Sequence, residues 1–268
     1  MPGEAERLSG AARTTEPCEL VVEEPLEIRL SGETLAITMR TPGHDRELVV
    51  GFLLAEGVIG GISDVAGIVH CGRTGEEGRE NTIDVTLVPG VRPPIDPETG
   101  LLARRGTLTT SACGVCGRRS IDDLLARAAP VAVAGTIAAE VVLESVRGLR
   151  GGQPVFERTG GCHAAALVSF GGEVLGTFED IGRHNAVDKV IGALVLAGRP
   201  SSDLVLAVSG RASFEIVQKA IAARIAVVAA VSAPSSLAVD LARRANVTLA
   251  AFVRPPAMTL YAGAERVR

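Results

Sequence analysis

The first pattern along the chain is a short-period alternation of apolar and polar residues within 20–110. Alternation on either side of Ser31-Gly32 predicts a β-hairpin. Asp45 then precedes helically spaced apolar residues that stop at Gly57, so we expect a helix that Asp45 caps. Further strands are expected over residues 65–70 and 82–88. These elements predict a smaller, β-rich N-terminal subdomain with one helix.

Within residues 120–268, several segments have apolar residues at the longer spacing that is typical of helices. A helix is expected over 140–149, and two strands flank the turn Gly171-Gly172. Continuous apolar runs then alternate with amphipathic helices: the runs are residues 204–209, 225–232 and 247–253, and the helices are residues 213–224 and 235–245. This order is typical of a buried parallel sheet made of β-α-β units. We therefore predict an α/β domain with a mixed, largely parallel sheet and helices on both faces.

The amino-acid composition indicates the number of domains and excludes some classes of partner. The 268 residues are 47% hydrophobic and 22% charged, which suits one large domain with a smaller one attached. Residues 1–19 are polar and are expected to form a disordered leader. Because no apolar run has membrane-spanning length and no signal-peptide core is present, we expect a cytoplasmic protein without membrane contacts. A net charge of −4, no Trp and a single Tyr disfavour nucleic acid as a partner.

Candidate chemistry is concentrated in residues 111–119, which include Cys113 and Cys116. A thiolate is the reactive form of cysteine, and a CxxC partner, nearby arginines or a helix N-terminus each lower a thiol pKa. Two arginines follow the motif directly, and Ser120 can cap a following helix. Two glycines in the stretch predict a mobile loop. We expect sulfur chemistry on this loop.

Three interpretations of the CxxC loop remain open from the residues alone. A structural zinc site needs four ligands, so Cys71 with His70, or Cys162 with His163, would have to complete it. A thioredoxin-type disulfide is disfavoured, because no strand-to-helix opening of that fold precedes the motif. In the third interpretation one cysteine holds a persulfide and passes its sulfur on. The odd count of five cysteines suits free, buried or reactive thiols, and it leaves Cys18 without an assigned role.

Polar residues also gather where the predicted parallel strands end. Since ligands bind outside the carboxyl ends of such strands, these residues are expected to face one ligand-binding edge. They are Ser209, Gly210 and Arg211 after the first strand, Ser232 with Ser235 and Ser236 after the second, and Arg254 after the third. Hydroxyls, arginines and helix N-termini together suit a phosphate or pyrophosphate. The chain has neither the GxGxxG dinucleotide fingerprint nor a P-loop motif.

A second polar group precedes the amphipathic helix that comes before these strands. Arg183 and His184 lie where the free N–H groups of this helix point outward, and the helix dipole and the cationic side chains favour an anion there. Asp180 or Asn185 could instead simply cap the helix. His163 follows two glycines at the start of a strand and is a further candidate, although a tight entry into the strand explains those glycines equally well.

Eight short stretches of the sequence are informative when they are taken together. They are EEPLEI at 23–28, MRTPGHD at 39–45, GFLLAEG at 51–57, SACGVCG at 111–117, TGGCHAAAL at 159–167, EDIGRHNAVDK at 179–189, SGRASFE at 209–215 and F-x-R at 252–254. Together they resemble the formate dehydrogenase accessory sulfurtransferases of the FdhD/NarQ family. The resemblance covers nearly everything after residue 20, and EDIGRHNAVDK with the paired CGVCG is its most specific part.

The resemblance implies a sulfur relay. A cysteine desulfurase loads a persulfide on Cys113, Cys116 assists, and the protein delivers sulfur to a Mo-bis(molybdopterin guanine dinucleotide) cofactor, or its tungsten counterpart, for the catalytic subunit of formate dehydrogenase. The resemblance also implies a cytidine-deaminase-like fold, a homodimer and no tightly bound metal of the protein's own. The family's cofactor-binding stretch falls on Phe252, Val253, Arg254, Pro255, Pro256 and Ala257.

The sequence departs from the family pattern in that last stretch. Ala251 stands where the family usually has glycine, and Pro255-Pro256 replaces a more flexible run. Deamination, which the implied fold often supports, is not expected, because the chain lacks H-x-E and Ala112 precedes Cys113. One alternative function stays open: a non-catalytic chaperone that holds the cofactor, with CGVCG as a structural metal site or an interaction loop.

Overall fold

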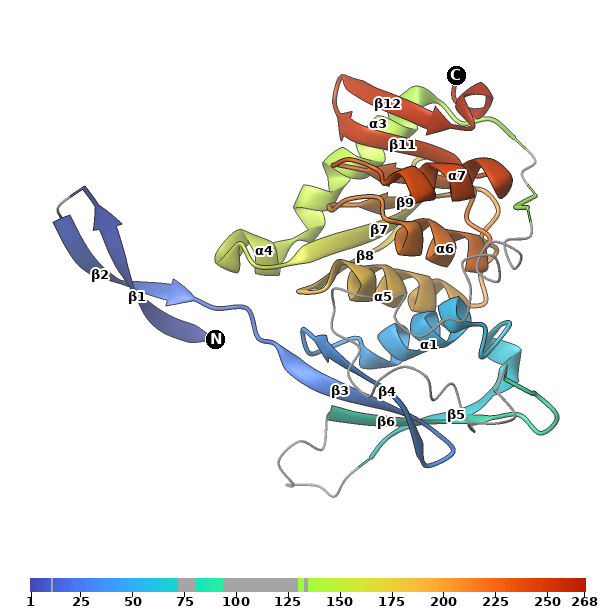
Figure 1. Ribbon diagram of the computed structural model, residues 1–268, viewed down its shortest axis with the longest axis horizontal. Coiled ribbons are helices and arrows are strands. Elements are labelled where there is room, and N and C mark those ends of the chain that lie inside the picture. The colour runs from blue at the N-terminus through green and yellow to red at the C-terminus, as the bar shows by residue number, and fades with distance from the viewer. Residues whose placement is uncertain (11, 72–80, 94–129, 133–134) are drawn as a thin grey trace.

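The computed structural model describes residues 1–10, 12–71, 81–93, 130–132 and 135–268. Its larger sheet has six strands in the order β12-β11-β10-β9-β7-β8 (Figure 1). The strands are β7 (His163–Ser169), β8 (Val174–Asp180), β9 (Leu204–Val208), β10 (Val227–Ala230), β11 (Thr248–Arg254) and β12 (Ala257–Ala262). Strands β9, β10 and β11 are parallel, and the remaining pairings are antiparallel. The predicted mixed sheet is confirmed, with parallel pairing confined to its central three strands.

Helices cover both faces of this sheet, as predicted. One face carries α5 (Arg183–Leu196), α6 (Phe214–Ala222) and α7 (Ser236–Arg244). The other carries α3 (Ala139–Arg147), which continues through η3 (Gly148–Gly152) toward α4 (Pro154–Thr159) (Figure 1). The short η4 (Ala264–Arg266) follows the last strand. Since the central strands are buried on both sides, their continuous apolar sequences are explained.

A second sheet of four strands comes from the N-terminal half, in the order β4-β3-β6-β5. The strands are β3 (Glu24–Leu30), β4 (Glu33–Arg40), β5 (Val65–His70) and β6 (Thr82–Leu87), with η1 (Ile62–Asp64) before β5. The predicted β3–β4 hairpin is confirmed. Ser31 and Gly32 have φ of 51° and 88°, the left-handed conformations that a tight two-residue hairpin turn requires.

Helix α1 (Asp45–Glu56) lies on this second sheet and ends at Gly57, as predicted. Its N-cap residue, however, is His44, so the prediction that Asp45 caps the helix is wrong. The Asp45 carboxylate instead accepts two hydrogen bonds from the buried Arg40 guanidinium, at 3.0 and 2.9 Å. A buried arginine needs such a paired carboxylate, and this requirement outweighs local capping.

The two sheets are joined by the packing of α1 on α5, so that Figure 1 shows sheet, helix, helix and sheet in succession. Two glycines make the contact possible. A Cβ added to Gly51 would lie 2.0 Å from the Asp188 carbonyl oxygen, and one added to Gly192 would lie 1.8 Å from the Glu47 carbonyl oxygen. The helix backbones therefore touch at this crossing, where only glycine fits.

The prediction of a disordered leader over residues 1–19 is wrong. Strands β1 (Pro2–Ser9) and β2 (Ala12–Glu19) pair as an antiparallel hairpin that projects from the body (Figure 1). Cross-strand ion pairs join Arg13 to Glu6 at 2.6 Å and Arg7 to Glu16 at 3.6 Å. Because nearly every residue of the hairpin is exposed, it has no apolar stripe from which a strand could have been predicted.

Candidate functional site

The candidate site lies at the carboxyl-terminal ends of the parallel strands in the six-stranded sheet. The parallel strands β9, β10 and β11 end there, and β7, which is antiparallel to β9, begins there. The N-termini of α5 and α6 reach the same edge. Five of the predicted site residues are brought together at this point, and we call them the strand-end cluster: His163, Arg183, His184, Ser209 and Gly210.

Ser209 anchors His163 within the strand-end cluster. The Ser209 hydroxyl oxygen accepts a hydrogen bond from the Ala164 backbone N–H at 2.9 Å and lies 3.4 Å from His163 Nδ1. Burial lowers the pKa of His163 below its ordinary value of 6.5, and the nearby charges of Arg183 and His184 lower this pKa further. His163 is therefore a neutral hydrogen-bonding group at physiological pH.

Arg183 is the first residue of α5 and packs against the backbone of Gly210. A Cβ added to Gly210 would lie 3.5 Å from Arg183 Cδ and 3.6 Å from His163 Nδ1. Within the described residues, the buried Nε of Arg183 has no hydrogen-bond partner. Gly182 precedes the helix and supplies no side-chain cap for its N–H groups. A cation and uncapped helix N–H groups at one place form an arrangement that favours an anion.

His184 faces the neighbouring helix. Its Nε2 lies 2.7 Å from Glu215 Oε2 and 3.5 Å from the Ser213 hydroxyl oxygen, and both paired side chains are buried or nearly so. Ser213 and Glu215 are site residues that the sequence reasoning missed. Both belong to the SGRASFE stretch at 209–215, so the motif contained the information.

The other polar residues of EDIGRHNAVDK serve the fold. The fully buried Asp180 carboxylate accepts hydrogen bonds from the backbone N–H groups of Thr41 and Gly182 and from the Asn185 side chain, at 3.1, 2.8 and 3.0 Å. It also forms an ion pair of 2.8 Å with the buried Lys189. This network fastens the start of α5 to the chain between β4 and α1, so Asp180 and Asn185 are structural.

The predicted cofactor-binding stretch, Phe252 to Ala257, forms the end of β11, its turn and the start of β12. Arg254 and Ala257 are paired, with Pro255 and Pro256 between them. Phe252 has φ of 50° and a side chain that is 43% exposed, while its backbone N–H donates to the Ser232 carbonyl oxygen at 3.2 Å. Such a conformation is uncommon for an aromatic residue and marks a candidate contact position.

Two of the predicted site arginines lie outside the strand-end cluster. Arg211 directly follows Gly210 and is exposed, and Arg254 is exposed at the end of β11, two strands away from β9. Both stand at the predicted sheet edge. Val253 is buried beside Arg254 and faces the core.

The cysteines divide into two groups. Cys113 and Cys116, the loop 111–119 and the expected helix at Ser120 lie outside the described residues. Of the others, Cys18 and Cys71 are half-buried, and Cys162 is buried 3.9 Å from the Thr41 hydroxyl. Burial raises the pKa of the Cys162 thiol, which disfavours its reactive thiolate form. In the described part of the chain, no three His, Cys, Asp or Glu side chains are grouped to hold a metal ion.

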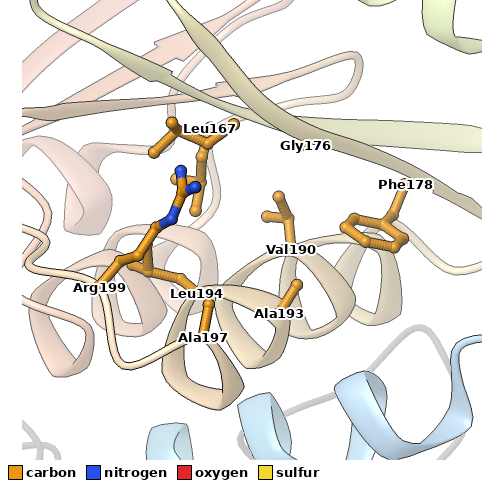
Figure 2. Close-up of a pocket in the computed structure, with 9 residues that line it drawn as sticks. Leu167, Gly176, Phe178, Val190, Ala193, Leu194, Ala197 and Arg199 are labelled. Atoms are coloured by element: carbon orange, nitrogen blue, oxygen red, sulfur yellow. The ribbon is translucent and has the colours of Figure 1, made fainter.

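Two of the cavities lined by described residues lie away from the strand-end cluster. One of about 190 Å³ opens between β8 and the C-terminal half of α5, and Figure 2 shows its apolar lining with Arg199 at the rim. The second, of about 580 Å³, surrounds the start of α1 and is lined by Pro42, Gly43, His44, Asp45, Arg46, Glu47 and His70. Neither cavity includes a residue of the strand-end cluster.

Comparison with known proteins shows the family of this chain. The family model described as FdhD/NarQ family matches residues 21–268. The chain belongs to the FdhD/NarQ family. A relative from Anaeromyxobacter dehalogenans (strain 2CP-C), named sulfur carrier protein FdhD, is 54% identical over 268 residues, covering 97% of this chain and 91% of the relative. One of the same name from Nocardia farcinica (strain IFM 10152) is 50% identical over 267 residues, covering 98% and 92%.

A solved structure shares the fold of this FdhD/NarQ family member. The crystal structure of a protein from Desulfotalea psychrophila, described as a formate dehydrogenase accessory protein, matches with a TM-score of 0.77 and 22% identity. The match covers 100% of this chain and 99% of the other. The resemblance found in the sequence motifs is therefore confirmed at the level of family and fold. Among the described helices, none has the length and apolar character needed to cross a membrane.

Proposed function

We propose that this FdhD/NarQ family member is a sulfur carrier in the maturation of formate dehydrogenase. The observation that carries the proposal is the 54% identity, over almost the whole chain, to a relative named sulfur carrier protein FdhD. The sequence supplies the chemistry this role needs, since Arg118 and Arg119 lie two and three residues after Cys116 and favour a thiolate.

The proposed reaction is a transfer between thiols. The Cys113 thiolate attacks the outer sulfur of a persulfide on a cysteine desulfurase, whose own cysteine leaves as the thiolate. Cys116 assists by relaying the sulfur or by protecting the new persulfide. The outer sulfur is then released at the sulfide level when the Cys116 thiolate attacks Cys113 Sγ, which supplies the two electrons and leaves a Cys113–Cys116 disulfide for cellular thiols to reduce. This sulfur passes to a molybdenum or tungsten bis-pterin guanine dinucleotide, bound as substrate, before the catalytic subunit of formate dehydrogenase receives it. We further propose that the protein acts in the cytoplasm as a homodimer.

The strand-end cluster supports an anionic substrate. Arg183 has a buried Nε without a partner in the described residues, and it stands beside the uncapped start of α5. Charge-assisted hydrogen bonds to phosphate contribute about 1.5–3 kcal/mol each. The exposed Arg211, Arg254 and Phe252 at the same edge suit the outer parts of a large dinucleotide. The cluster, extended by these three residues, is the proposed binding site for the guanine dinucleotide.

The test of the carrier role is mass spectrometry after incubation with a cysteine desulfurase and cysteine. We expect a mass gain of one or more sulfur atoms in the unmodified protein and in Cys116→Ser, and none in Cys113→Ser. Persulfide retained in Cys113→Ser and lost in Cys116→Ser would reverse the two roles. Bound zinc with inert thiols would favour the alternative, a cofactor-holding chaperone with a structural metal.

Delivery is tested with the Cys113→Ala, Cys116→Ala double variant. We expect it to fold and to bind guanosine diphosphate, because the strand-end cluster contains neither cysteine. Formate dehydrogenase made in cells that contain only this variant should hold metal and pterin but lack its terminal sulfido ligand, and should be inactive. Active formate dehydrogenase from these cells would contradict the sulfur-carrier proposal.

A further inference from the structure

Glu215 forms a close pair with a residue of the strand-end cluster. It is the second residue of α6, and its Oε2 lies 2.7 Å from Nε2 of His184 in the first turn of α5. The two side chains are 14% and 9% exposed. At this distance the His184 Nε2–H donates to the carboxylate, which determines the nitrogen that holds a proton.

A second pair fixes the position of the first. One turn farther along both helices, the Lys219 ammonium donates to both oxygens of the buried Asp188, at 2.6 and 2.8 Å. Residues four apart lie on one helix face, so α5 presents His184 and Asp188 to α6, which presents Glu215 and Lys219. The two pairs link α5 and α6 at successive turns, and they hold α6 in the orientation that faces His184.

Charged groups lie on both sides of His184. Arg183 is its neighbour on α5, and the charges of Arg183 and His184 both act on His163 of β7, whose pKa they lower. Asp188 lies one turn farther along α5 and pairs with Lys219 of α6. Glu215 is the carboxylate that lies 2.7 Å from the imidazole, on the side of α6.

We propose that Glu215 is a positioning residue of the strand-end cluster. By accepting the Nε2–H, it fixes the tautomer and the ring orientation of His184 before a ligand arrives. In this tautomer Nδ1 is a hydrogen-bond acceptor, which suits a hydroxyl or N–H group of the ligand, while Arg183 suits its phosphates. Partners that orient metal-binding histidines change affinity by about tenfold or more, and we expect an effect of about tenfold for His184. The identity of the ligand, a guanine dinucleotide, rests on the proposed function.

The direct test is nitrogen NMR of the histidine side chains. The chain has four histidines, so the ring signals are few, and a His184→Gln variant assigns the signals of His184. In the unmodified protein, and in Glu215→Gln, whose amide oxygen still accepts, we expect His184 protonated at Nε2. In Glu215→Ala we expect a mixture of tautomers. An unchanged His184 spectrum in a folded Glu215→Ala protein would overturn the proposal.

Calorimetry with guanosine diphosphate gives the functional readout. We expect affinity to fall about tenfold in Glu215→Ala and by less than about threefold in Glu215→Gln. The matched control is Gln218→Ala on the same helix, which removes only a 3.4 Å contact with the Ala55 carbonyl oxygen and should leave affinity unchanged. An equal loss in Gln218→Ala would overturn the positioning role, because any perturbation of α6 would then suffice.

The two readouts separate this inference from the proposed function. If the unmodified protein binds no guanosine diphosphate, the ligand assignment fails, and the tautomer spectra still decide the role of Glu215. If Glu215→Ala does not fold, Glu215→Asp is used, since the shorter side chain retracts the acceptor and keeps the charge. A His184 spectrum and an affinity in Glu215→Asp equal to those of the unmodified protein would then contradict the inference.

Discussion

The start of α5 has two sides that differ in how their polar groups are paired. On the side toward the β4–α1 connection, Asp180 has four hydrogen-bonded or ionic partners, and Lys189 also donates to the Thr41 carbonyl oxygen at 2.8 Å. On the side toward β9, the Arg183 Nε is buried without a partner in the described residues. Buried polar groups are usually paired in folded proteins, and the unpaired Arg183 Nε stands beside the uncapped start of α5, so it is the candidate contact for the proposed anion. One continuous motif therefore builds the fold on one side and the proposed binding site on the other.

Removing the Asp180 carboxylate is expected to have the largest effect on the structural side. Asp180→Ala leaves the buried Lys189 ammonium without its ion-pair partner, and breaking a buried pair costs about 3–5 kcal/mol. Urea unfolding should show this loss in the free energy of unfolding. The control Asp240→Ala removes an exposed carboxylate from α7 and should change that free energy by less than about 0.5 kcal/mol. Similar small losses in both variants would show that the Asp180 network is not structural.

Gly192→Ala probes the helix crossing behind that network. The added methyl group would collide with the Glu47 carbonyl oxygen, and overpacking of this kind costs about 1–3 kcal/mol or more because backbone has to move. Gly148→Ala is the matched control, since a Cβ at that position meets nothing within 4 Å. Thermal unfolding should show a lower Tm for Gly192→Ala alone. A Tm equal to that of Gly148→Ala would refute backbone contact between α1 and α5.

Arg183→Ala tests the binding side and should separate affinity from stability. Because the Arg183 Nε has no partner within the described protein, we expect the free energy of unfolding to change by less than about 1 kcal/mol. The affinity for guanosine diphosphate should fall about tenfold or more, which is the loss of one charge-assisted hydrogen bond. Calorimetry and urea unfolding of the same variant provide the comparison. A large loss of stability with unchanged affinity would place Arg183 on the structural side.

The smallest expected effect concerns pH. Burial, with Arg183 and His184, lowers the pKa of His163 in the folded protein, so the unfolded chain binds more protons as the pH falls below 6.5. Folding stability should therefore decrease from about pH 8 to about pH 5, by at most about 1.4 kcal/mol per pH unit for one proton. His163→Asn should reduce this slope, and His70→Asn, at an exposed position, should not. Equal slopes in all three proteins would rule out a neutral buried His163.

Local patterns predicted most of the fold. The turn at Ser31-Gly32, the helix that ends at Gly57 and the β-α-β units after residue 204 follow from hydrophobic period and glycine position, which depend on neighbouring residues. The β1–β2 hairpin was missed, because exposed strands without an apolar stripe leave no such pattern. The role of Asp45 was also missed, because its partner Arg40 is buried by tertiary contacts that local capping rules do not contain.

Part of the candidate site was predictable for a topological reason. The carboxyl ends of parallel strands share one edge, and this rule predicted the place of Ser209 and Gly210. Arg183, at the start of α5, and His163, at the start of β7, were separate predictions that the structure brings to the same edge. The pairing of His184 with Glu215 was not predictable, since it joins two helices across 31 residues of sequence. Arg211 and Arg254 stand at the predicted edge, but a strand-end rule does not determine the direction of an exposed side chain.

The contact of Gly51 and Gly192 with carbonyl oxygens of the opposing helix limits how far α1 and α5 can slide past each other. Domain movements often use small sliding displacements of packed helices. At these two glycines the backbones meet without an intervening layer of side chains. The four-stranded sheet is therefore expected to follow α1, and through it the start of α5, in any movement of the two halves.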